Sequence, residues 1–118
     1  MNPIYYYIRD KNNHPIITVC LLENNGDISR GIAVCSKQES PWKNYGRALA
    51  FKRARKAIKA QQDLFMVVRD EIVIILTELD ANREFFWYKG KFNPTLTEYE
   101  MALLKRKIKL LEKNQKEF

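Results

Sequence analysis

Apolar and polar residues alternate in three short stretches between residues 4 and 36. Residues 4–9 (IYYYIR) and 15–23 (PIITVCLLE) are rich in β-branched and aromatic side chains, which favour strands. Asn25-Gly26 follows the second stretch and is a strong hairpin signal, and residues 28–36 (ISRGIAVCS) form the third stretch. The pattern therefore predicts an antiparallel meander of three strands.

The faces of these strands predict what packs on them. Both faces of residues 15–23 are mostly apolar, so we expect the sheet to be covered on both sides. In the third strand one face is apolar except for Arg30. The other face carries only small residues, which suit the close approach of a helix: Ser29, Gly31, Ala33 and Cys35.

A helix is predicted from Trp42 to about Gln62, after Ser40 as the N-cap and Pro41 at the first helical position. Its small and apolar residues recur at three- and four-residue spacing: Gly46, Ala50, Ala54, Ala57 and Ile58. Because glycine costs about 1 kcal/mol in a helix, we expect Gly46 to lie against the small-residue strand face. Four cations fall on the opposite side of the helix: Lys52, Arg55, Lys56 and Lys59.

The rest of the chain is less regular. Residues 64–68 (LFMVV) are a candidate fourth strand, and Asp70 is a candidate cap of a short helix, although a strand is the alternative there. Residues 85–92 (FFWYKGKF) read as an aromatic strand or loop. Thr97 to Glu100 is a capping box. It opens a predicted amphipathic helix with an apolar stripe: Met101, Leu104, Ile108 and Leu111.

These elements predict one α+β domain over residues 1–118. We expect a three- to four-stranded antiparallel sheet packed with the basic helix and the C-terminal amphipathic helix, and three helices in all. MNPIYYYIRD does not have the form of a secretory signal, and no apolar run is long enough for a membrane span. Cys20 and Cys35 fall in predicted strands and, by ladder counting, about four residues apart along the sheet, so we expect free thiols in a reducing cytoplasm.

The net charge of +7 is unevenly distributed. Residues 41–62 contain seven basic and no acidic residues, whereas residues 63–100 contain four basic and eight acidic ones. A helix that only needed solubility would interleave glutamate with these cations. The alternative is that the lysines pair with the acids of residues 63–100.

Motifs for catalysis are missing from the sequence. His14 is the only histidine and lies in a predicted turn, and there is no CxxC, HExxH or glycine-rich phosphate loop. Acidic residues between 63 and 80 could hold a metal in principle, but their spacing forms no recognisable set. We therefore expect a protein that is not an enzyme and needs no metal or cofactor.

Several segments together resemble small uncharacterised proteins encoded by bacteriophages and prophages: YYYIRDKNNHPIITVCLLE, RGIAVCS, GRALAFKRARKA, RDE and NPTLTEYE. This resemblance implies a phage or mobile-element product in a bacterial cytoplasm, where such proteins often bind nucleic acid or block host defences. Residues 14–60 are also similar in order to the later part of a double-stranded RNA-binding domain, in which lysines at the helix start touch phosphates. The preceding helix is missing here, and KQESPW separates Ser36-Lys37 from the helix.

We therefore expect binding of DNA or RNA through the phosphate backbone. The predicted contacts lie on the basic helix: Lys43, Arg47, Lys52, Arg55, Lys56 and Lys59. Trp42 and Tyr45 are candidates for base stacking or for anchoring the helix start. Tyr5, Tyr7 and Arg9 share a strand face and form either a stacking platform or part of the core. The alternative function is an anti-CRISPR-like inhibitor of a host nucleic-acid-associated protein, and a homodimer is also compatible with the sequence.

Overall fold

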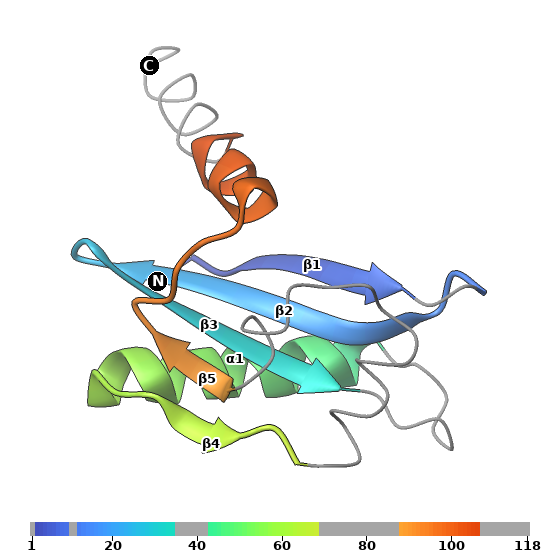
Figure 1. Cartoon of the computed structure of the whole chain (residues 1–118), viewed down its shortest axis with the longest axis horizontal. Coiled ribbons are helices and arrows are strands. Elements are labelled where there is room, and N and C mark those ends of the chain that lie inside the picture. Colours follow the sequence, from blue (N-terminus) through green and yellow to red (C-terminus); the bar gives the residue numbers. More distant parts are fainter. Residues whose placement is uncertain (1, 10–11, 35–42, 69–87, 107–118) are drawn as a thin grey trace.

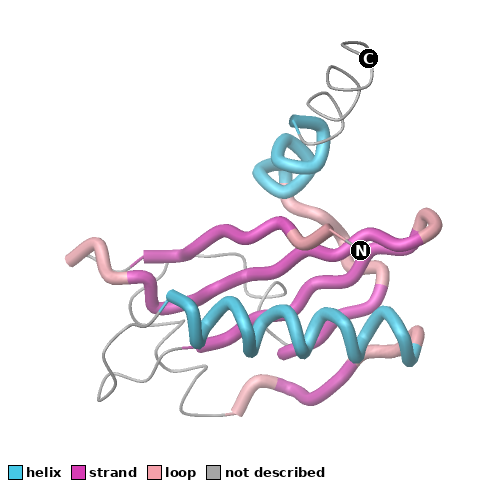
Figure 2. The backbone as a smooth tube through the Cα atoms, turned by 180° about the vertical axis from the view of Figure 1, so that it is seen from behind, coloured by secondary structure: helices cyan, strands magenta, loops and turns pink. Residues whose placement is uncertain are grey.

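The computed structural model describes residues 2–9, 12–34, 43–68 and 88–106. Their five strands form one antiparallel sheet in the order β1-β2-β3-β5-β4. The strands are β1 (Ile4–Arg9), β2 (Pro15–Asn24), β3 (Asp27–Val34), β4 (Leu64–Met66) and β5 (Tyr88–Phe92). Helix α1 (Lys43–Ala60) lies along one face of the sheet, and a helix whose described part covers residues 98–106 rises from the other side (Figures 1 and 2).

The predicted class is correct, but the sheet has five strands rather than three or four. The candidate strand at residues 64–68 forms β4, and the end of the aromatic segment forms β5. The predicted helix capped by Asp70 lies outside the described residues. So do Cys35, Trp42 and the aromatic residues before Tyr88.

The hairpin between β2 and β3 has the predicted register. Asn25 and Gly26 have φ angles of 53° and 87°, so both central turn residues have the positive φ of a type I′ turn. This turn places Cys20 opposite Gly31, as ladder counting predicts. Cys20 is a buried free thiol, as expected.

Both faces of the sheet are buried, as the pattern of β2 predicts. Toward α1, Cys20, Leu22 and Ala33 pack with Ala50, Ala54 and Ile58. On the opposite face a second cluster contains Tyr6, Ile17, Val19, Leu21 and Ile32.

The C-terminal helix contacts this second cluster through Leu103, whereas Met101 on the same helix is 44% exposed. Of the predicted apolar stripe, Met101 is therefore not in the core, Leu104 is half-buried, and Ile108 and Leu111 lie outside the described residues.

Glycines set how closely α1 approaches the sheet. A Cβ on Gly31 would lie 2.0 Å from the carbonyl oxygen of Ala50, and one on Gly90 would lie 2.8 Å from that of Arg53. Ser29 on the same small-residue face donates a hydrogen bond to the carbonyl of Ala54 at 2.7 Å. The predicted close approach at β3 is therefore confirmed.

Gly46 also lies in close contact, but its neighbour is Thr18 on β2 and not the small-residue face of β3. A Cβ at this position would lie 2.5 Å from Thr18 Oγ1. We expect Gly46→Ala to lower the free energy of unfolding by about 1–3 kcal/mol, because overpacking outweighs the gain in helix propensity. In a Thr18→Ala background most of this cost should disappear, because the hydroxyl at 2.5 Å is gone and only the Cβ of residue 18 remains, at 3.3 Å. Equal costs in both backgrounds, measured by urea unfolding, would exclude this contact as the reason for the glycine.

Candidate nucleic-acid interface

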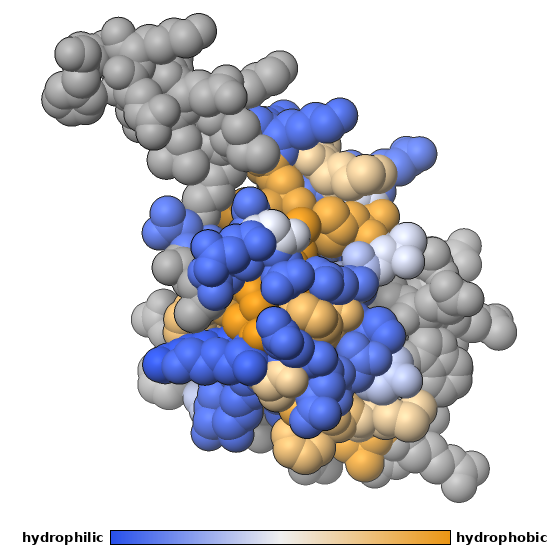
Figure 3. All heavy atoms as spheres, turned by 90° about the vertical axis from the view of Figure 1, so that its left-hand side faces the viewer, coloured by the Kyte–Doolittle hydropathy of each residue, from blue (hydrophilic) through white to orange (hydrophobic). Residues whose placement is uncertain are grey.

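The side of α1 that faces away from the sheet is basic. Lys52, Arg55, Lys56 and Lys59 are all exposed, and we call these four residues the basic face. Ala50, Ala54 and Ala57 are fully buried on the opposite side of the helix. The predicted division of the helix into a small-residue side and a cationic side is therefore confirmed. Figure 3 shows hydrophilic side chains gathered over the end of the molecule where α1 ends.

None of the four cations forms an ion pair within the described part of the chain. Two of the three described acids of residues 63–100 have other partners: Asp63 binds Lys91 at 2.7 Å, and Glu100 binds Arg30 at 2.5 Å. The third, Glu98, is exposed on the C-terminal helix, and the other acids of this segment lie outside the described residues. Partial burial opposes ionisation of Asp63, but hydrogen bonds from Lys91 and from the backbone N–H of Phe92 lower its pKa. Within the described residues, internal neutralisation of the basic face is therefore not supported.

The other predicted site residues occupy different positions. Tyr45 is 63% exposed, and helical periodicity places it on the same side of α1 as Lys52 and Lys56. Arg47 is exposed but lies on the flank of α1 that faces β1. Lys43 is the first residue of α1, but its side chain is not among those that the structure describes. Trp42 lies outside the described residues.

Arg47 joins α1 to the first strand through aromatic contacts. Its guanidinium carbon lies 5.7 Å from the ring centres of both Tyr5 and Tyr7, and its Nε–H donates a hydrogen bond to the Tyr7 hydroxyl. Arg9 lies over Tyr7 from its own strand, also at 5.7 Å. We call Tyr5, Tyr7, Arg9 and Arg47 the arginine–tyrosine cluster.

The two tyrosines of this cluster are half-buried, so they are neither an open platform nor full core residues. Tyr5 lies opposite Cys20 in the sheet and packs against the core cluster beneath α1, and burial, together with the Cys20 side chain, raises its pKa. Tyr6, between them in sequence, points to the other face of the sheet and is the buried tyrosine of the strand.

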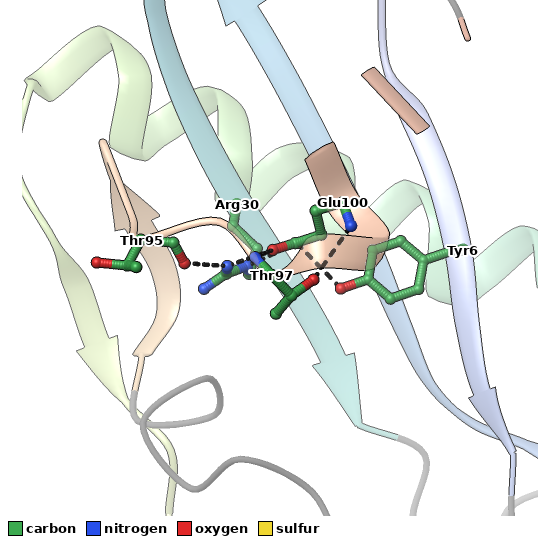
Figure 4. A network of polar contacts seen from close by, with 5 residues as sticks. All are labelled: Tyr6, Arg30, Thr95, Thr97 and Glu100. Atoms are coloured by element: carbon green, nitrogen blue, oxygen red, sulfur yellow. Dashed lines mark hydrogen bonds and ion pairs between the residues drawn. The ribbon is translucent and has the colours of Figure 1, made fainter. Parts of the chain in front are cut away.

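A buried polar network fixes the C-terminal helix on that other face (Figure 4). Glu100 accepts hydrogen bonds from Arg30 at 2.5 and 2.9 Å and from the Tyr6 hydroxyl at 3.0 Å. Thr97 completes the predicted capping box, since its Oγ1 accepts from the Glu100 N–H and its own N–H donates to Glu100. Burial, reinforced by Glu100, raises the pKa of Tyr6, which keeps its hydroxyl protonated as a donor. Sequence reasoning missed this network, although Arg30 on an apolar strand face was a signal for a buried counter-ion.

No family model matches the chain, and neither a curated protein nor a solved structure is detectably similar to it. Its function has to be inferred from its own residues. None of the described helices is long and apolar enough to cross a membrane. Within the described residues there is also no group of three or more histidine, cysteine, aspartate or glutamate side chains that could hold a metal ion.

Proposed function

We propose that this protein binds nucleic acid without catalysis, through the phosphate contacts of the basic face on α1. The observation that carries the proposal is that Lys52, Arg55, Lys56 and Lys59 are exposed together and form no ion pair in the described structure. Cations at this spacing repel one another by a few tenths of a kcal/mol per pair. A polyanion would remove that cost and release its condensed counter-ions on binding.

The geometry of α1 suits an extended ligand. Lys52 and Lys59 are about 10 Å apart along the helix axis, so the basic face is long enough to contact more than one phosphate of a strand. Tyr45 on the same side adds an exposed ring about 10 Å before Lys52. Such contacts neutralise phosphates but read no sequence, so we expect similar affinity for unrelated sequences of one strand type.

Two matched double variants test the proposal. Lys56→Gln/Lys59→Gln removes two cations from the basic face. Lys105→Gln/Arg106→Gln removes two exposed cations from the C-terminal helix, which packs on the opposite side of the sheet. We expect the first variant to weaken binding at least about tenfold in fluorescence anisotropy near 0.1 M salt and the second to change it by less than about threefold. Equal losses would show that only net charge matters and would contradict a defined interface on α1.

A further inference from the structure

The arginine–tyrosine cluster has a composition that a phosphate-binding surface does not need. Phosphate contacts require cations, and the basic face already supplies them. The cluster instead combines two aromatic rings with two guanidinium planes, each 5.7 Å from a ring centre. Flat aromatic and guanidinium groups are the surfaces on which proteins stack unpaired bases.

The cluster is also held in place before any ligand binds. Tyr5 packs against the core on the α1 side of the sheet, and Tyr7 accepts a hydrogen bond from Arg47. The Arg9 guanidinium also donates a hydrogen bond, through Nη1, to the backbone carbonyl of Asn13 at 3.0 Å. Because Arg9 and Arg47 are exposed while the rings beneath them are half-buried, the guanidinium groups are the accessible part of the cluster.

The cluster and the basic face lie on one continuous flank of α1. Phe51 follows Arg47 by one helical turn and is half-buried, and Arg55 follows by two turns and belongs to the basic face. Arg47 and Arg55 are therefore about 12 Å apart along the helix axis. A strand whose phosphates lie along the basic face can reach the cluster with its next few nucleotides.

Resting on the proposed function, we infer that the ligand is a single-stranded nucleic acid whose bases stack on Arg47 and Arg9 while its phosphates contact the basic face. In a duplex the base faces are already stacked on one another, so they are not available to stack on the cluster, and the phosphates still are. The cluster then distinguishes a single strand from a duplex, and the basic face does not.

Three probes of the same length test this inference: an oligothymidylate of about 16 nucleotides, its abasic analogue and a duplex. The wild type should bind the oligothymidylate at least about fivefold more tightly than the abasic strand, which has the same phosphates and no bases. Arg47→Lys keeps the charge but loses the guanidinium plane, so it should bring the affinity for the oligothymidylate close to that for the abasic strand and abolish most of this difference. Tyr7→Phe, which keeps the ring, should retain at least half of the difference.

Each other outcome has a distinct meaning. If the oligothymidylate and the abasic strand bind equally, the stacking inference is overturned while the phosphate interface stands. If none of the three probes binds, the proposed function fails and the inference fails with it. Thermal unfolding of each variant shows whether weaker binding comes from a lost contact or from a lost fold. The inference is also overturned if Arg47→Lys folds like the wild type and keeps the full difference between the oligothymidylate and the abasic strand.

Discussion

Replacing Lys52, Lys56 and Lys59 together with glutamine should weaken nucleic-acid binding on the order of 100-fold near 0.1 M salt. A plot of the logarithm of the binding constant against the logarithm of the salt concentration has a negative slope. Each lysine lost from a phosphate contact makes this slope less steep by about 0.9 for a duplex and about 0.7 for a single strand. Because the lost term is electrostatic, unrelated sequences of one strand type should be affected alike. Titrations at several salt concentrations measure both the affinity and the slope.

The same triple variant should fold as well as the wild type. Glutamine has nearly the helix propensity of lysine, and removing like charges from one side of α1 relieves repulsion. The thermal unfolding midpoint should therefore stay the same or rise slightly. A variant that unfolds earlier would show that the lysines have partners that stabilise the fold, and a variant with unchanged affinity would show that they do not bind the ligand.

Replacing Glu100 with glutamine should lower the free energy of unfolding by about 3–5 kcal/mol. Glu100 is fully buried and Arg30 is 4% exposed, so the substitution removes the carboxylate that pairs with a buried guanidinium. Glutamine keeps the shape of the side chain, which separates the effect of charge from that of packing. Chemical denaturation of both proteins gives the difference.

Glu98→Gln is the matched control for that experiment, because Glu98 is exposed on the same helix and should change stability by less than about 0.5 kcal/mol. The double variant Arg30→Met/Glu100→Met should lose less free energy of unfolding than Arg30→Met and Glu100→Met lose together as single variants, since no charge is left buried. Additive costs would mean that Arg30 and Glu100 contribute independently.

The elements that could be predicted from the sequence are those specified by local patterns. Asn25-Gly26 determines the β2–β3 register because a two-residue turn fixes which residues face one another. Residue spacing along α1 separates Ala54 from Lys56 because a helix repeats every 3.6 residues. The capping box at Thr97 is likewise a contact between residues three apart.

Contacts between distant residues could not be predicted in this way. β5 contains Lys89, Gly90 and Lys91, which have low strand propensity, and it forms because Gly90 pairs with Gly31 under α1. The pairing of Arg30 with Glu100 joins β3 to a helix far along the chain. The alternation of Tyr5 and Tyr7 indicated a shared face, but no local pattern indicates where α1 crosses it and brings Arg47 over both rings.

The most direct test of the central claim is binding of the wild-type protein to single- and double-stranded DNA and RNA at about 50 mM salt, followed by the same titrations as salt is raised. A basic face with four phosphate contacts predicts measurable binding and a log–log slope of about −3 for a single strand. No binding to any of the four probes, together with capture of a host nucleic-acid-associated protein, would contradict the account and favour the inhibitor function instead.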